Sequence, residues 1–500
     1  MTETHSRTGK KTVTTLKALY QKGHQWLSRC LTRTPRGKGK KQVFSAGVDG
    51  TTPLILPRKA HGISRKAISP YAVKVLYRLH QQGFQAYLVG GGVRDLLLAG
   101  KPKDFDIATD ASPEEVRRLF RNCRLIGRRF RLAHVFFGAH IVEVATFRRS
   151  VSGDSEPTQS TEGMLLRDNC YGTLEEDAWR RDFSVNALYY NIADFSVVDY
   201  VGGLADLKTR SLRILGDPET RYREDPVRML RAVRFAAKLN FSIHPKTAAP
   251  IQTLGVLLQG VPGARLSEEM LKLFFTGHGV ASYTLLRNYG LFDRLFGQAS
   301  SAAEKHPAAW AWIERVLQNT DERIRQEKSS HPAFLYAAML WHPYLQTVRE
   351  LVRSGAHGGA ASAEAMEHVC QAKTDLVPPP KRLVPSIQEI WHLQSRLTHL
   401  QPRRVKRLVQ HPRFKAAYDF LLLRASVKES NVAELAEWWQ RFVEADEAER
   451  VSLLQVLNQS AQASPQHGHS PLHKKRRRRR GPKKGPIQAS GTDVSGENET

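Results

Sequence analysis

The chain has 500 residues, of which 41% are hydrophobic, and a formal net charge of +28 at pH 7. This length is sufficient for two to four domains with buried cores. No hydrophobic run approaches the roughly 18 residues that cross a bilayer, and the four cysteines include no C-x-x-C pair. The composition therefore predicts no transmembrane segment, argues against a zinc site or a disulfide framework, and favours a reducing compartment.

The positive charge is concentrated at the two ends of the chain. Residues 1–41 hold eleven Lys and Arg against one Glu, and residues 474–500 hold nine against three acidic residues. We therefore predict basic, mostly disordered extensions over 1–60 and 461–500. Nucleic acid is the commonest partner of such a chain. An organellar transit peptide at the N-terminus and contact of the basic tails with anionic lipid stay open as alternatives.

The first ordered elements surround a glycine-rich turn. Apolar spacing predicts a helix over 68–82 and a buried strand over 87–89. Three glycines follow, and Arg94 then stands near the start of a second helix. Such a turn lets backbone N–H groups approach an anion closely. The glycines match neither the P-loop nor the dinucleotide-binding pattern.

Two aspartates, Asp104 and Asp106, return beside this turn. Residues i and i+2 of a strand point to the same side, so the two carboxylates converge. Paired carboxylates next to a phosphate-binding turn are typical of two-metal nucleotidyl transfer, although either feature alone fits an ordinary turn or strand end. Strands are also predicted around 124–126, 134–138 and 141–147. The last of these carries Glu143, a third candidate metal ligand.

Two later segments carry charged stripes. Residues 175–190 are predicted to form a helix with a polar front at Arg180, Arg181 and Asp182. Residues 218–239 are predicted to form a single helix whose charged residues share one face through spacing of three and four. A surface ion pair and a solvated face are the alternatives. Asp accepts from an exocyclic amine and Arg donates to ring nitrogens and carbonyls, so the second stripe also suits a nucleotide base.

Residues 240–460 are predicted to be all-helical, because apolar residues recur there at spacings of three and four. Two basic runs are candidates for contact with RNA phosphates. The first is Arg403, Arg404, Lys406 and Arg407, and the second, in the C-terminal tail, includes Arg476, Arg477 and Arg478.

Three blocks stand in a fixed order: LVGGGVRDLLLAGKPKDFDIAT, RRDFSVNALYY and REDPVRMLRAVRFAAKL. Over about residues 65–270 the chain resembles the class II nucleotidyltransferases, the family of bacterial poly(A) polymerases and CCA-adding tRNA nucleotidyltransferases. The resemblance implies an α+β fold. A nucleotidyltransferase head with a small mixed sheet spans 65–215, neck helices that recognise the base span 216–280, and a helical RNA-binding body spans 281–460.

The resemblance also implies roles for individual residues. Asp104 and Asp106 hold two Mg²⁺ ions, with Glu143 as the third candidate ligand. The glycine turn, at Gly91 and Gly92, binds the triphosphate of ATP together with Arg94. In the second block, Arg181 contacts the nucleotide and Asp182 belongs to the active site. In the third block, Asp225 and Arg228 read the incoming base, while Glu224 and Arg231 hold them in place.

Other features bear on which member of the family this is. Residues 125–135, LIGRRFRLAHV, resemble the signature of bacterial poly(A) polymerases, and no His-Asp dipeptide of a phosphohydrolase domain is present. The predicted activity is template-independent addition of AMP from ATP to RNA 3′ ends in a bacterial cytoplasm, with RNA-degradation machinery as a candidate partner. A CCA-adding enzyme, a non-catalytic RNA-binding protein and a membrane-surface protein attached by its tails are the alternatives.

Overall fold

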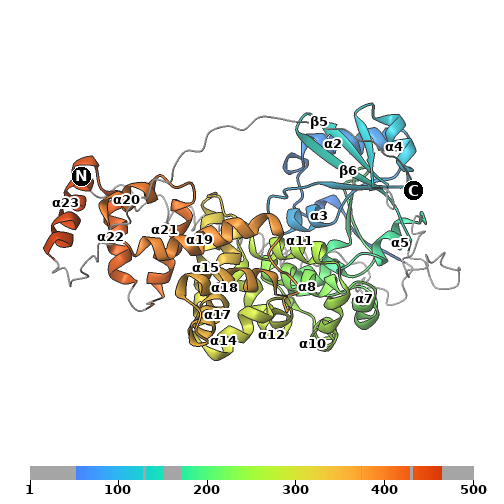
Figure 1. The fold of residues 1–500 in the computed structure, drawn as a ribbon. Coiled ribbons are helices and arrows are strands. Elements are labelled where there is room, and N and C mark those ends of the chain that lie inside the picture. The colour runs from blue at the N-terminus through green and yellow to red at the C-terminus, as the bar shows by residue number, and fades with distance from the viewer. Residues whose placement is uncertain are drawn as a thin grey trace, which may run out of the picture.

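The computed structural model describes residues 52–127, 131–149, 170–372, 374–427, 429 and 432–463. A head built on one β-sheet lies above one end of an elongated array of helices (Figure 1). No helix in these ranges is long and apolar enough to cross a membrane. The extensions predicted over 1–60 and 461–500 lie almost wholly outside the described ranges. Arg476, Arg477 and Arg478 also lie outside them.

The head sheet has eight strands, and only β3 and β6 pair in parallel. Its spatial order is β1 (Leu54–Leu56), β8 (Val197–Asp199), β7 (Leu188–Asn191), β2 (Ala86–Val89), β3 (Asp106–Thr109), β6 (His140–Thr146), β5 (Leu132–Phe137) and β4 (Cys123–Ile126). The mixed sheet was predicted. However, β1 pairs with β8 inside the range predicted as the extension 1–60, so the head begins earlier than predicted.

Helices cover the two faces of the sheet unequally. α2 (Pro70–Gln81), α3 (Gly91–Leu97), α4 (Pro113–Leu119) and α6 (Gly203–Thr209) pack on one face in the main hydrophobic core. The other face holds a smaller cluster under α5 (Leu174–Trp179). α4 begins at Pro113 because Ser112 and Glu115 form a capping box at its N-terminus. The face under α5 is the one that carries the site.

The helix predicted over 175–190 is wrong in its second half. α5 ends at Trp179, a short 3₁₀ turn spans Ser184–Asn186, and β7 follows. Both faces of this strand are covered: Leu188 and Tyr190 lie in the main hydrophobic core and Tyr189 lies in the cluster under α5, so all three are buried. Burial on both faces removes the polar–apolar alternation by which a strand is normally recognised.

The single helix predicted over 218–239 is in fact two helices, α7 (Pro218–Glu224) and α8 (Val227–Leu239). Asp225 between them is extended, with φ −150° and ψ 96°. The cause is Pro226, whose ring disfavours the helical conformation at the preceding residue. The break turns Asp225 out of the helical stripe to which the sequence assigned it.

The rest of the described chain is helical except for β10 (Ser242–Ile243), which pairs with β9 (Ser211–Leu212). The helices are α9 (Pro245–Ala248), α10 (Ile251–Leu254), α11 (Gly263–Phe274), α12 (Gly279–Asn288), α13 (Leu291–Leu295), α14 (Gly297–Lys305), α15 (Ala308–Arg325), α16 (Pro332–Met339), α17 (Trp341–Arg353), α18 (Gly358–Gln371), α19 (Val384–Leu397), α20 (Pro402–Val409), α21 (Phe414–Ser426), α22 (Ala433–Glu444) and α23 (Glu447–Ala463). From the end of α19 onward they share a separate core around Trp439.

Candidate active site

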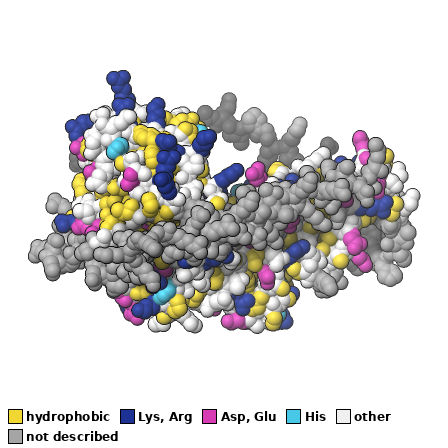
Figure 2. Space-filling view, turned by 180° about the vertical axis from the view of Figure 1, so that it is seen from behind, with side chains coloured by type: hydrophobic (Ala, Val, Ile, Leu, Met, Phe, Trp, Pro, Cys, Tyr) yellow, Lys and Arg dark blue, Asp and Glu magenta, His cyan; other side chains and the backbone are white. Residues whose placement is uncertain are grey.

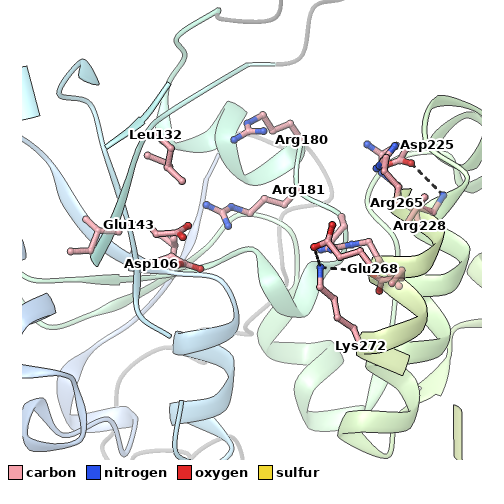
Figure 3. A pocket seen from close by; sticks show the side chains of 17 residues that line it. Asp106, Leu132, Glu143, Arg180, Arg181, Asp225, Arg228, Arg265, Glu268 and Lys272 are labelled. Carbon is pink, nitrogen blue, oxygen red and sulfur yellow. Dashed lines mark hydrogen bonds and ion pairs between the residues drawn. The ribbon is translucent and has the colours of Figure 1, made fainter. Parts of the chain in front are cut away.

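A cavity of about 510 Å³ lies between the head sheet and the neck helices α8 and α11. Carboxylates from the sheet stand on one side and charged side chains of the neck stand on the other, with Arg180 and Arg181 between them (Figure 3). The acidic lining residues are Asp106, Glu143, Asp182, Asp225, Glu268 and Glu269, and the basic ones are Arg180, Arg181, Arg228, Arg231, Arg265 and Lys272.

Asp106 and Glu143 form the sheet wall of this cavity. Parallel pairing of β3 with β6 sets Ile107 beside Val144, which brings the two preceding acids side by side. Burial raises the pKa of Asp106 to about 6; the charge of Glu143 adds to this rise, and Arg181 opposes it. Glu143 is 48% exposed, and its carboxylate lies 3.7 Å from Nε2 of His134 on β5. The two carboxylates thus stand on neighbouring strands and interact electrostatically, with Arg181 as a nearby cation.

Asp104 is exposed and precedes β3, outside the cavity lining. Its charge also contributes to the raised pKa of Asp106, so the two residues interact electrostatically. In the described ranges, no three His, Cys, Asp or Glu side chains are placed to hold an ion as they stand. The donors that do gather, oxygens of clustered carboxylates that repel one another, are nevertheless those that Mg²⁺ prefers. The residues therefore fit such an ion.

The glycine turn and Arg94 lie behind this wall. Gly90 has a positive φ of 69°, and a Cβ on it would stand 3.5 Å from Nη1 of Arg181. Arg94 is only 2% exposed, and its guanidinium donates to Asp95 at 2.6 and 2.8 Å and to Asn186 at 2.5 Å. The structure does not place Gly91, Gly92 or Arg94 in the cavity lining.

Asp177 holds the two arginines in the middle of the cavity, and the sequence analysis missed it. It is 1% exposed, and its carboxylate accepts from Arg180 at 3.0 Å, from Arg181 at 2.9 Å and from the Tyr189 hydroxyl at 2.8 Å. Burial acts to raise the pKa of Asp177, but Arg181 and Arg180 hold it below the ordinary value. The available signal was the spacing of three and four residues from Asp177 to Arg180 and Arg181 in the helix predicted over 175–190.

Asp182 is tied to the neck. Its carboxylate accepts from Nε of Arg231 at 3.0 Å and from the Phe183 amide at 2.8 Å. Burial acts to raise the pKa of Asp182, and Arg231 keeps it low. The resemblance implied that Arg231 supports Asp225 and Arg228; in the structure it instead joins α8 to the head through Asp182.

The residues implied to read the base lie at the break between α7 and α8. Nη1 of Arg228 donates to Glu224 at 2.8 Å, the supporting contact that was expected. Asp225 accepts from Nη2 of Arg265 at 3.0 Å. Arg265 belongs to α11, as does Lys272, and neither was predicted. No motif marks them, because only packing of α11 against α8 brings them to the cavity.

The predicted RNA-binding run lies far from this cavity. Arg403, Arg404, Lys406 and Arg407 are all exposed on α20, whose Val405 and Leu408 are buried in the core around Trp439. In Figure 1, α20 lies at the end of the helical array opposite the head. On the face turned away in Figure 1, Lys and Arg side chains also stand out from the head (Figure 2).

Comparison with known proteins agrees with this layout. Three family models match: "Poly A polymerase head domain" at residues 86–213, "Probable RNA and SrmB- binding site of polymerase A" at 240–302, and "Polymerase A arginine-rich C-terminus" at 354–484. The crystal structure of the Bacillus stearothermophilus CCA-adding enzyme in complex with CTP shares the fold, with a TM-score of 0.51 and 24% identity, covering 78% of this chain and 91% of that one.

Relatives in sequence separate the two branches of the family. Poly(A) polymerase I of Salmonella typhi is 51% identical over 435 residues, which are 85% of this chain and 93% of that protein. The CCA-adding enzyme of Levilactobacillus brevis is 40% identical over 252 residues, which are 48% of this chain and 62% of that protein. Similarity to the poly(A) polymerase thus extends over the helical body as well as the head. The chain belongs to the bacterial poly(A) polymerases of the class II nucleotidyltransferase family.

Proposed function

We propose that this enzyme adds AMP from ATP to RNA 3′ ends in the cavity between the head sheet and the neck, with Asp104 and Asp106 as the carboxylates that hold Mg²⁺. The observation that carries the proposal is the division of the cavity. On the sheet wall the charge of Glu143 adds to the raised pKa of Asp106, whereas on the neck wall acids and arginines are paired with each other. The first suits a metal and a triphosphate, and the second suits a base.

In the proposed reaction the RNA 3′-hydroxyl attacks the α-phosphorus of ATP, and pyrophosphate leaves. When bound, Mg²⁺ lowers the pKa of that hydroxyl and offsets the charge of the leaving group. Arg181, held by Asp177 and Tyr189, faces the sheet carboxylates and contacts the phosphates. Asp225 and Arg228 present an acceptor and a donor to the adenine edge. Asp182 acts through Arg231, fixing the neck against the head.

The glycine turn has a positioning role in this proposal. Arg94 is buried with Asp95 and Asn186 as partners, so it fixes the turn whose backbone N–H groups approach the triphosphate. Glu143 completes the carboxylate group on the sheet wall. Two Mg²⁺ ions are the number proposed, as in other two-metal nucleotidyl transfer sites.

The decisive experiment is extension of a 5′-labelled unstructured RNA with Mg²⁺ and each nucleotide supplied separately. Long ladders with ATP alone are expected. Addition of three residues, only to a tRNA lacking its end and only with CTP present, would establish the CCA-adding alternative. Tight RNA binding without extension under any condition would favour the non-catalytic alternative.

The proposal also assigns RNA contact to α20. Because Arg403, Arg404, Lys406 and Arg407 are exposed, changing all four to Gln is expected to weaken RNA binding while leaving the fold intact. Each lost phosphate contact lowers the slope of log K against log salt by about 0.7 on single strands, so a decrease of about 3 is the upper bound. An unchanged slope, measured by fluorescence anisotropy, would remove α20 from the RNA path.

The proposed setting is the bacterial cytoplasm, with RNA-degradation machinery as a protein partner. The basic tails give the chain a means of peripheral contact with anionic lipid as well as with RNA. Flotation with anionic liposomes at rising salt separates the two: RNA-bound protein stays at the bottom of the gradient, whereas lipid-bound protein rises with the vesicles.

A further inference from the structure

One half of the head sheet has an open face beside the cavity. Strands β4, β5 and β6 bury Ala133, Val135, Val142 and Val144 on the face that α2 and α4 cover. The alternate residues of these strands point to the opposite face, where they are exposed or half-buried. Ile126 is 46% exposed there and Ile141 is 51% exposed. Large apolar side chains left exposed on one face of a sheet indicate a binding surface.

The chemistry of this open face matches a nucleic-acid strand. The Arg124 guanidinium lies over the Phe136 ring, 5.6 Å from its centroid, and the His134 ring is 6.3 Å from the same ring. Arg124 and His134 are cross-strand partners, so the three side chains form one group. Aromatic rings that stack with bases, flanked by cations that meet phosphates, are what proteins use to bind single-stranded RNA.

The open face runs directly into the cavity. Leu132 and Glu143 lie on the same face of their strands and also line the cavity wall. In Figure 3 they stand opposite Asp225 and Arg265. With the base of ATP on the neck wall and its triphosphate beside Asp106, the part of the sheet beyond Glu143 stays open, so an acceptor strand ending near Asp106 continues outward over β5 and β4.

We infer that this face, centred on Phe136 and Arg124, is the binding site for the last nucleotides of the acceptor RNA. The inference rests on the proposed function and adds the place where the RNA 3′ end lies. One terminal base stacks on Phe136, and Arg124 contacts the phosphate beside it. The surface is thereby assigned to single-stranded RNA and not to a protein partner.

Steady-state extension of a short oligoadenylate tests the inference through Phe136→Ala and Arg124→Gln. Loss of one base-stacking contact costs about 1–3 kcal/mol, so KM for the oligonucleotide should rise about tenfold in Phe136→Ala and several-fold in Arg124→Gln. KM for ATP should stay within twofold. Arg117→Gln is the matched control, because Arg117 is also exposed but lies on α4, which covers the other face. An RNA KM in both variants equal to that of the control would overturn the inference.

A second measurement does not depend on turnover. RNA carrying a 3′-terminal 4-thiouridine, irradiated on the full-length protein, should crosslink to the peptide that spans β4 to β6. Crosslinks confined to the neck or body helices would contradict the assignment. If the wild-type protein binds and crosslinks this RNA on β4 to β6 yet never extends any RNA, the proposed function fails while the RNA site stands. If the wild-type protein extends RNA normally and Phe136→Ala and Arg124→Gln leave KM for RNA unchanged, the RNA site fails while the proposed function stands. Because Arg124 is exposed, its variant keeps the test valid even if Phe136→Ala fails to fold.

Discussion

The two walls of the cavity differ in how their charged side chains are arranged. On the sheet wall, Asp106 and Glu143 stand on neighbouring strands, and the pKa of Asp106 is raised to about 6 by burial and by the charge of Glu143. On the neck wall each group proposed to read the base has a partner of opposite charge: Arg228 donates to Glu224, and Asp225 accepts from Arg265.

This difference indicates what each wall binds. Clustered carboxylates without a cation are costly to keep ionised, and a divalent ion removes that cost. Acids and arginines that are already paired keep their remaining donors and acceptors in fixed positions. The entropic cost of ordering these side chains when a base binds is therefore small. The sheet wall is therefore suited to the metal and phosphates, and the neck wall is suited to selection of the nucleotide.

The largest effect should come from Asp106→Asn, which removes the central carboxylate of the sheet wall. Lewis-acid catalysis is worth several kcal/mol, and each 1.4 kcal/mol is a tenfold change in rate. We therefore expect kcat to fall about 10³-fold or more, while the Kd for RNA changes little. Asp110→Asn is the control, since Asp110 is exposed just beyond the far end of the same strand and its amide counterpart still accepts from the Gln85 N–H. Wild-type turnover in Asp106→Asn would contradict the metal assignment.

The next effect concerns the group between the walls. Asp177→Asn leaves Arg180 and Arg181 without their buried counter-charge. Hydrogen bonds to charged groups contribute about 1.5–3 kcal/mol, so kcat/KM for ATP should fall about 10- to 100-fold, and the melting temperature should also fall. Glu175→Gln, on the same helix, is the matched control. A lower melting temperature with unchanged kcat/KM would mean that Asp177 is structural only.

The raised pKa of Asp106 predicts a pH dependence confined to the sheet wall. An ordinary Asp is ionised well below pH 6, whereas Asp106 takes up a proton as the pH falls through about 6. Because metal binding requires the ionised carboxylate, the Mg²⁺ concentration for half-maximal rate should rise by up to about tenfold per pH unit below 6. Magnesium titrations at pH 5.2, 6.2 and 7.5 measure this. Equal requirements at all three values would show that Asp106 does not take up the proton.

The smallest of these effects should come from Arg265→Gln on the neck wall, which frees Asp225 to turn away. We expect KM for ATP to rise about fivefold and the preference for ATP over CTP to narrow, because an unfixed acceptor pairs less selectively. Metal dependence should not change. Arg223→Gln is the control, since Arg223 is exposed on α7 and lies 3.9 Å from Glu219. A changed Mg²⁺ requirement in Arg265→Gln would contradict the assignment of the metal to the sheet wall alone.

Local signals in the sequence were sufficient for most of the head. The glycine turn, the acids around β3 and the alternation on β6 each follow from neighbouring residues, and the structure has the strands and helices expected there. The predictions for two elements were wrong, for identifiable reasons. β7 is buried on both faces and shows no alternation, and the Asp225–Pro226 step divides a charged stripe that otherwise has helical spacing.

The residues missed in the site have a different cause. Asp177 could have been found, because it precedes Arg180 and Arg181 by three and four residues in the helix predicted over 175–190. Arg265 and Lys272 could not, since they reach the cavity only through the packing of α11 on α8. Arg94 shows the converse: its motif is intact, but the fold buries it away from the cavity lining.

The most direct test of the division between the walls is a crystal structure with a non-hydrolysable ATP analogue and Mn²⁺ in place of Mg²⁺. We predict anomalous Mn²⁺ peaks beside Asp104 and Asp106, with the adenine within hydrogen-bonding distance of Asp225 and Arg228. Metal bound away from Asp106, or adenine resting against the sheet wall, would contradict it.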